Sequence, residues 1–507
     1  MLPEFDLLYK NPKKISPSKQ LDMAMESLLL KETVDLLTVN PIYRRQIFEL
    51  LRYPEQDREN LVWRQQALAD FEANESLLHE FEKIHEKDLQ LQESMKLLKR
   101  SFSEIQTSGN KSRTSNKDSA VSTIKTLADC VDKALGLYTA YKTAFGRAKV
   151  KSEIFTGMKS FVEEMTERPE FGELSALSSE LFESVDLSTS YVILAKIDEY
   201  LRICDCEMFM LSSDPYCYGE NSGSRKDKSL PVAFIGFEQE SDSQLSFFAE
   251  RSMVKLTNLL QSVVTQLRQP FEKLADGFFF YDFAFIYKRK LADLGLPCCT
   301  PEFNEKGCRF ECRNIYDLWF ALKQRQKDPL AVPGKTLVPN DAILTEDCPV
   351  CVISGRNNAG KTVFLRAIGL IQVLAQSGLP VPCTEALVTP AATVFAYFTA
   401  LDIGQGRFEE EVETCSGFLD VMQPNDLLLF NEVYQSTAYD EGSEALSEFM
   451  TMAALCGAKT VAVTHLPDIR GNMEKLRKEY GFKGTVSYLK AEEKDGKATH
   501  RFVSDVE

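Results

Sequence analysis

The sequence predicts a multidomain protein in which an all-α region is followed by an α/β domain. Over most of the first 294 residues, apolar side chains recur every three or four positions, which is the spacing of helices with one buried face. After Pro297 the pattern changes to short, continuous apolar runs separated by helical stretches. The length of 507 residues allows about two to four domains at roughly 100–200 residues each.

The N-terminal region is predicted to be helical with one polar interruption. Residues 21–98 are rich in Glu, Leu, Lys and Gln, with apolar residues at helical spacing. Residues 100–120 are rich in Ser, Thr and Asn and predict a connector, after which helical periodicity resumes over 124–211. The pattern breaks at residues 214–243, where only 230–237 read as a strand.

A long helix is predicted from about residue 246 to residue 294. Its apolar residues step by three or four positions and form one seam: Leu256, Leu260, Val263, Leu267, Phe271, Leu274 and Phe278. Pro270 predicts a kink within this helix, and Gly295 and Pro297 predict its end.

Three short apolar runs predict buried parallel strands in the C-terminal part. They are residues 350–353, 427–430 and 460–463, each a continuous run of four apolar or β-branched residues. Such runs are typical of strands that are covered by helices on both faces of a sheet. Residues 298–507 are therefore expected to form the α/β domain.

A phosphate-binding loop is predicted between the first of these strands and the helix that follows it. The segment fits G-x-x-x-x-G-K-[ST] at every fixed position: Gly355, Arg356, Asn357, Asn358, Ala359, Gly360, Lys361 and Thr362. Glycines let successive main-chain N–H groups point at one phosphate cluster, and the helix N-terminus adds partial positive charge. We expect these residues to bind ATP, with Lys361 at the β- and γ-phosphates and the Thr362 hydroxyl on Mg²⁺.

The other two strands supply candidate catalytic residues. The strand at 427–430 runs into Asn431 and Glu432, and Glu432 is placed to activate the attacking water. Asn431 stands where an Asp usually supports Mg²⁺, and its neutral amide predicts weaker metal binding and a slow ATPase. His465 follows the strand at 460–463 and is expected to sense the γ-phosphate or the attacking water.

The order of these pieces resembles the MutS family of DNA mismatch repair ATPases. Asn357 matches the Asn of that family's G-P-N-M-G-G-K-S loop, Asn431-Glu432 its Asp-Glu, and Thr464-His465 its T-H. Val338-Pro339-Asn340-Asp341 looks like its lead-in. The resemblance implies a helical core and lever, an ABC-type P-loop ATPase domain, and a homodimer with composite ATP sites.

Three departures from the family pattern are visible. The core-like region starts within the first 25 residues, so we expect the mismatch-reading and connector domains to be missing. The DNA-gripping clamp would be residues 213–249 and short. In the signature S-x-F-x-x-E, Phe408 and Glu411 fit and are expected at the partner-facing edge, but Gly406 replaces the Ser that reaches the partner's nucleotide. Arg407 or the Gly406 N–H is expected to take that role.

The resemblance divides the chain into four parts. Residues 1–212 are expected to form the helical core, 213–249 the reduced clamp, 250–297 the lever, and 298–507 the ATPase domain. The implied function is an ATP-dependent DNA-binding switch that closes on mismatched, branched or otherwise deformed DNA. The alternative is a nucleotide-gated protein-interaction scaffold that binds ATP but hydrolyses it weakly, as Asn431, Gly406 and the net charge of −16 suggest.

Composition and the lack of predicted targeting segments limit the class of protein and its expected location. With 44% hydrophobic and 26% charged residues the chain is globular, and neither disordered nor collagen-like. A local basic groove can sit on an acidic protein, so DNA binding stays open. No signal peptide or membrane span is predicted, and we expect a cytoplasmic protein whose thirteen cysteines are free thiols. Two alternatives for the cysteines are a Cys348–Cys351 pair and a zinc site: Cys298, Cys299, Cys308 and Cys312.

Overall fold

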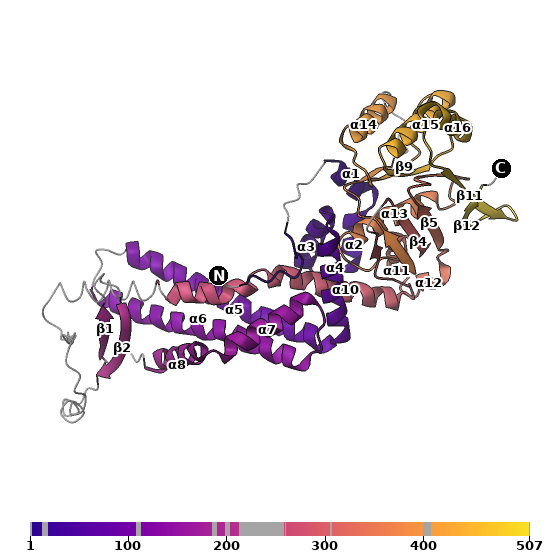
Figure 1. The fold of residues 1–507 in the computed structure, drawn as a ribbon. Coiled ribbons are helices and arrows are strands. Elements are labelled where there is room, and N and C mark those ends of the chain that lie inside the picture. The colour runs from indigo at the N-terminus through magenta and orange to yellow at the C-terminus, as the bar shows by residue number, and fades with distance from the viewer. Residues whose placement is uncertain are drawn as a thin grey trace. The chain divides into compact units, whose positions relative to one another are not determined.

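The computed structural model of the protein contains two compact units. The described residues are 3–12, 19–107, 113–184, 190–197, 203–211, 258, 260–304, 307–398 and 407–505. The first unit comprises Met1–Phe5 and Ala73–Lys273, and the second comprises Asp6–Glu72 and Leu274–Glu507. Figure 1 shows both units and labels many of their helices and strands.

The first unit is built on two long helices, α5 (Glu75–Thr107) and α6 (Arg113–Arg147), which pack along each other. Two shorter helices, α7 (Glu153–Glu167) and α8 (Pro169–Ser184), pack against α6. A cluster of aromatic rings joins α5, α6 and α7: Phe81, Tyr141, Phe145 and Phe155. Burial of these rings is a strong reason for the helices to pack as they do. The predicted helical character is confirmed here.

The predicted connector at residues 100–120 is largely helical, because α5 and α6 extend into it from either side. Residues 108–112 lie outside the described residues. The predicted clamp at 213–249, the strand predicted within it and the beginning of the predicted long helix also lie outside them. Local polarity alone misplaced each of the two helix ends at the connector by about two turns, because α5 runs to Thr107 and α6 begins at Arg113.

The helix predicted to reach residue 211 is wrong after α8. Residues Ser190–Ile197 (β1) and Ile203–Leu211 (β2) pair as an antiparallel hairpin, with Val192 opposite Phe209 and Tyr191 opposite Met210. β-Branched and aromatic residue types, of which this segment contains several, favour strands over helices. The apolar spacing fitted a helix, but the residue types favoured strands.

The kink predicted at Pro270 falls where the structure interrupts the helix. Residues 260–268 are helical, Gln269–Phe271 form a 3₁₀ turn (η2), and α10 (Leu274–Asp293) ends where the sequence predicts. Proline has no N–H, and its ring clashes with the preceding turn, so the hydrogen-bond ladder is interrupted at this point.

The second unit begins with helices from the N-terminal part of the chain: α1 (Lys19–Ser27), α2 (Leu30–Leu37), α3 (Pro41–Arg52) and α4 (Arg58–Ala73). Helices α2 and α3 pack against α10, and the Tyr43 hydroxyl donates to Asp282 over 2.5 Å. The compact units thus differ from the predicted ranges, since residues 6–72 pack with the C-terminal part. The assignment of ranges to family domains stays a prediction.

The C-terminal part contains two sheets. The six-stranded sheet has the order β12-β11-β6-β10-β9-β8, and all neighbours are parallel except β11 and β12. Its strands are β6 (Val350–Ser354), β8 (Val394–Phe398), β9 (Leu427–Asn431), β10 (Lys459–Val463), β11 (Val486–Lys494) and β12 (Lys497–Ser504). The four-stranded sheet has the order β3-β7-β4-β5, from strands β3 (Glu302–Phe303), β4 (Phe310–Ile315), β5 (Asn340–Leu344) and β7 (Glu385–Val388).

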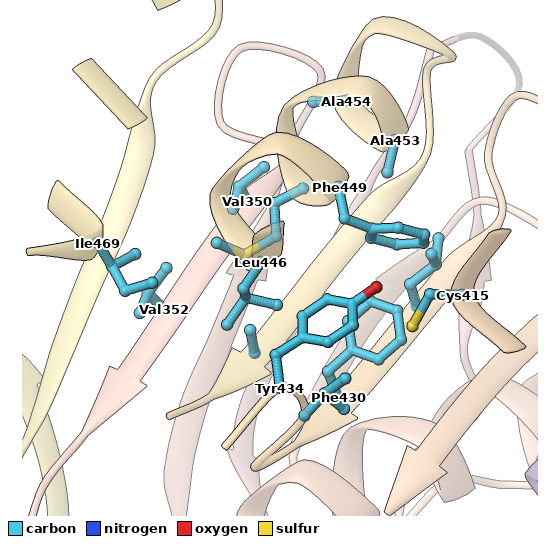
Figure 2. Packing of buried hydrophobic residues seen from close by; sticks show 14 of the residues in the cluster. Val350, Val352, Cys415, Phe430, Tyr434, Leu446, Phe449, Ala453, Ala454 and Ile469 are labelled. Carbon is cyan, nitrogen blue, oxygen red and sulfur yellow. The ribbon is translucent and has the colours of Figure 1, made fainter. Parts of the chain in front are cut away.

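Helices cover both faces of the six-stranded sheet. The C-terminal helices are α11 (Leu318–Lys327), α12 (Pro333–Thr336), α13 (Lys361–Ala375), α14 (Arg407–Val421), α15 (Tyr439–Leu455) and α16 (Ile469–Tyr480). Leu428 and Phe430 of β9 belong to a buried cluster with α14, α15 and α16 (Figure 2). Leu429 points the other way, towards Gly369 of α13. The three predicted parallel strands and the fold class are confirmed.

Helix α13 is apolar on nearly every side, which explains why the N-terminal segment packs on it. Leu429 of β9 and Leu28 of the N-terminal segment both lie within 3 Å of the position that a Cβ would take on Gly369. At its C-terminal end, the buried Arg64 donates to the carbonyls of Leu8 and Ser377 over 2.8 and 2.9 Å. A helix without a polar face needs such cover from several elements.

None of the helices in the described ranges combines the length and the apolar character that spanning a membrane requires. Within the same residues, His, Cys, Asp and Glu side chains nowhere gather in a group of three or more that could hold a metal ion. The four cysteines of the zinc interpretation have other neighbours, since Cys308 contacts Lys459 and Cys299 contacts Cys383. The zinc interpretation therefore has no support.

Candidate functional site

The predicted phosphate loop joins β6 to α13, as the motif requires. Gly355 has φ of +139°, and a Cβ added there would lie 2.6 Å from the Cβ of Ala491 on β11. Gly360 precedes α13 with φ of +94°, and Asn358 has φ of +65°. These values belong to glycine and, less often, to asparagine, because other side chains clash with the backbone there. The residue types of the loop thus follow from its geometry.

Lys361 is held inside the loop. Its Nζ donates to the carbonyl of Gly355 over 2.6 Å and to that of Arg356 over 3.1 Å, and it lies 2.8 Å from His465 Nε2. Burial lowers the pKa of Lys361, and the carboxylate of Glu432 opposes this by raising it. A buried cation at the N-terminus of a helix is suited to binding phosphate.

The two predicted metal ligands lie side by side. The Thr362 hydroxyl donates to Asn431 Oδ1 over 3.2 Å, which links the first turn of α13 to the end of β9. Both groups offer oxygen atoms, the ligand type that Mg²⁺ prefers, so the residues fit a magnesium ion. Neither carries a charge, and this pair is therefore a weaker donor set than a hydroxyl with a carboxylate.

Glu432 and His465 meet at the carboxyl ends of β9 and β10, where Asn431 is paired with Val463. Glu432 Oε1 is 3.5 Å from His465 Nε2, and the same nitrogen is 3.0 Å from Asn357 Oδ1. Burial and then the Lys361 cation lower the pKa of His465, while Glu432 raises it. The neutral imidazole is therefore favoured at pH 7. Nε2 accepts a hydrogen bond from Lys361 Nζ in the tautomer that carries its proton on Nδ1, and it donates to Asn357 Oδ1 in the other tautomer.

The turn after β9 is held in an unusual conformation. Glu432 and Tyr434 have φ of +60° and +62°, and the Glu432 N–H donates to the Val463 carbonyl over 2.9 Å. A Cβ added at Gly442 of α15 would lie 2.3 Å from the Tyr434 carbonyl oxygen, so α15 approaches this turn as closely as a glycine allows. The sequence indicated Glu432 but not the shape of the turn that carries it.

The signature segment is only partly described. Gly406 lies outside the described residues, and so does the side chain of Arg407 at the start of α14. The expectation that Glu411 lines a partner-facing edge is wrong, because its side chain is fully buried. Its Oε2 accepts the Tyr434 N–H over 2.7 Å, and the Ser436 hydroxyl donates to the same oxygen over 3.3 Å.

His500 of β12 is a neighbour of the loop that sequence reasoning missed. Its Nδ1 lies 3.2 Å from the Ala359 carbonyl, and a Cβ added at Gly360 would lie 3.5 Å from the same nitrogen. Asn340 fixes this strand, donating to the His500 carbonyl and accepting the Phe502 N–H over 3.0 and 2.8 Å. The hairpin is about 140 residues from the loop in sequence, and no motif marks it.

The predicted residues thus converge on one edge of the sheet. A buried cation, a pair of oxygen ligands and a carboxylate beside an imidazole surround the N-terminus of α13. Such a set can bind a polyphosphate, hold Mg²⁺ and orient a water molecule.

Comparison with known proteins gives a consistent result. Residues 351–503 match the family model of MutS domain V. The chain is 27% identical over 261 residues to the endonuclease MutS2 of Bacillus cytotoxicus, covering 46% of this chain and 31% of that protein. It is 30% identical over 190 residues to endonuclease MutS2 of Shouchella clausii, covering 36% and 23%. It is 33% identical over 162 residues to the putative endonuclease MutS2 of Bacillus subtilis, covering 30% and 20%.

These matches span less than a third of the length of each relative. They confirm the family resemblance that the loop and the strand ends indicate. The C-terminal part of this chain is therefore a domain of the MutS domain V family, and the chain is a distant, partial relative of the MutS2 endonucleases.

Proposed function

We propose that this chain binds ATP with Mg²⁺ and hydrolyses it, and that this cycle switches a homodimer between states with different affinity for DNA. The observation that carries the ATPase part is the convergence of Lys361, the Thr362–Asn431 pair and the Glu432–His465 pair at one sheet edge. A cation, oxygen ligands and a water-orienting carboxylate are the groups that phosphoryl transfer requires.

In this proposal the loop binds the phosphates. Its main-chain N–H groups at residues 355–360 and the N-terminus of α13 favour negative charge. Lys361 binds the β- and γ-phosphates in this proposal, exchanging its present bonds to the Gly355 and Arg356 carbonyls for bonds to phosphate oxygens. The exchange keeps a buried cation paired throughout, which limits its cost.

The residues proposed to carry out hydrolysis lie at the carboxyl ends of β9 and β10. When bound, Mg²⁺ neutralises charge on the phosphates, and Thr362 and Asn431 are the residues that would hold it. Glu432 accepts a proton from the attacking water, and the neutral His465 contacts the γ-phosphate. Because Asn431 brings no charge to the metal, we expect slower turnover than an Asp at this position would give.

The dimer and the DNA are further parts of the proposal. The match to MutS domain V supports a composite site, in which Gly406 and Arg407 of one subunit contact the nucleotide of the other. The resemblance assigns residues 1–212 to a core, 213–249 to a reduced clamp, 250–297 to a lever and 298–507 to the ATPase domain. The preferred DNA would be mismatched, branched or otherwise deformed.

A second candidate is a nucleotide-gated scaffold that binds ATP and scarcely hydrolyses it. The specific observation in its favour is the neutral Thr362–Asn431 pair at the metal position. Turnover separates the two candidates, because both require binding and only the first requires hydrolysis.

The test measures steady-state ATP hydrolysis and DNA binding in the same preparations. Glu432→Gln should abolish hydrolysis and preserve ATP binding, while Glu474→Gln on the exposed face of α16 should change neither. Affinity for homoduplex, mismatched and branched DNA is measured with and without nucleotide. Hydrolysis that survives Glu432→Gln would remove the ATPase proposal. Equal, nucleotide-independent affinity for all DNA shapes would remove the switch.

A further inference from the structure

A second element controls the position of Glu432. The turn from Glu432 to Ser436 contains two non-glycine residues with positive φ, Glu432 and Tyr434. Such conformations persist only where surrounding contacts hold them. The Glu432 N–H is bound by the Val463 carbonyl of β10, and the Tyr434 N–H is bound by the Glu411 carboxylate of α14. Each left-handed residue therefore has its own anchor.

Glu411 is the charged anchor of the two. Its side chain is fully buried, and one oxygen accepts both the Tyr434 N–H over 2.7 Å and the Ser436 hydroxyl over 3.3 Å. Hydrogen bonds to a carboxylate are roughly twice as strong as neutral ones. Removal of this group leaves a buried N–H without its acceptor at a point two residues from Glu432.

One face of α14 is shaped around this turn. Phe408, Glu411 and Cys415 follow helical spacing and therefore lie on the same side of the helix. The Phe408 ring lies 5.9 Å from the Tyr434 ring, and Cys415 belongs to the same buried cluster as Tyr434. Figure 2 shows Cys415 and Tyr434 together in the buried cluster. A shift of α14 would thus move the turn with it.

We propose that Glu411 is a positioning residue for Glu432, fixing the turn on which that carboxylate stands and coupling α14 to the hydrolytic step. This inference rests on the proposed ATPase function. In this proposal Glu411 itself does not contact the nucleotide. Nucleotide affinity should therefore be independent of Glu411, and turnover should depend on it.

The test compares Glu411→Ala and Glu411→Gln with a matched control, Asp426→Asn. Asp426 is also fully buried and accepts the main-chain N–H groups of Thr393 and Gln423 over 2.6 and 2.7 Å, but at the opposite end of β9. Thermal unfolding, the Kd for a non-hydrolysable ATP analogue with Mg²⁺, and single-turnover hydrolysis are measured for each. Hydrogen exchange at the Tyr434 amide is followed in the same variants.

Glu411→Ala should lower the hydrolysis rate about 100-fold, the scale expected when a reacting group is displaced by roughly 1 Å, with Kd unchanged. Glu411→Gln keeps an acceptor oxygen and should recover most of the rate. The Tyr434 amide should exchange faster in Glu411→Ala alone. Asp426→Asn should lower the unfolding temperature and leave the rate unchanged.

Equal losses of rate and stability in Glu411→Ala and Asp426→Asn would overturn the positioning role and leave a structural one. A second outcome is that Glu411→Ala turns over ATP as fast as wild type, while Glu432→Gln abolishes turnover. That result would refute this inference and leave the ATPase proposal standing. A wild-type protein that binds ATP without any Glu432-dependent turnover would refute both.

Discussion

Gly355→Ala tests the loop geometry most sharply. A methyl group at this position would lie 2.6 Å from the Ala491 Cβ and 3.2 Å from the Ala491 main-chain nitrogen, in a backbone with φ of +139°. Strain in such a conformation costs about 1–3 kcal/mol. Forcing an extra carbon into a packed site costs about 1–3 kcal/mol more. The free energy of unfolding should therefore fall by roughly 2–6 kcal/mol.

The matched control is Gly417→Ala in α14. A Cβ there has nothing within 4 Å, and the backbone is helical, so alanine should stabilise by about 0.5–1 kcal/mol. Chemical denaturation of both variants checks whether the free energy of unfolding falls in Gly355→Ala and rises in Gly417→Ala. ATP binding is measured in the same variants. A Gly355→Ala protein as stable as wild type, binding ATP equally well, would refute the assigned loop conformation.

Three further predictions follow from the site. Asn431→Asp should raise the hydrolysis rate. It should also lower the Mg²⁺ concentration for half-maximal activity about tenfold, because a charged acceptor gains roughly 1–2 kcal/mol over a neutral one. A Mg²⁺ titration of the hydrolysis rate checks both effects. The lowered pKa of His465 contributes stability that is present above its unfolded value of about 6.5 and is lost as pH falls from that value through the lower pKa of the folded state. The stability difference between wild type and His465→Gln, measured by denaturation across pH 5–8, should therefore shrink below about pH 6.5. Gly442→Ala should slow hydrolysis more than it weakens ATP binding, since its methyl group would press on the Tyr434 carbonyl; equal effects on both would contradict this.

The parts of the site that a short stretch of chain defines were predictable. Gly355 to Thr362 form a contiguous motif whose residue types are required by local backbone geometry. The strands before Asn431 and His465 are continuous apolar runs, and parallel strands bring their carboxyl ends to one edge. Local chemistry and a simple rule of sheet topology were therefore sufficient to assemble these residues.

The parts that depend on distant contacts were not predictable. Whether Glu411 is exposed or buried depends on how α14 lies against the turn after β9, and helical spacing alone cannot decide this. His500 reaches the loop only because β12 completes the sheet beside β11. The packing of Arg64 on the end of α13 joins residues more than 300 positions apart. The hairpin at 190–211 was mispredicted for a different reason. The spacing of its apolar residues favoured a helix, whereas its residue types favoured strands.

The central claim is that the loop before α13 binds the phosphates of ATP through Lys361, and titration calorimetry with Mg-ATP tests it directly. Wild type should bind one ATP per chain. Lys361→Met should bind at least roughly 30-fold more weakly, since removing one partner of a buried charged hydrogen bond costs about 2 kcal/mol or more. Lys475→Met, at an exposed position on α16, should bind like wild type. No heat of binding in wild type, or equal affinity in the Lys361 variant, would contradict the claim.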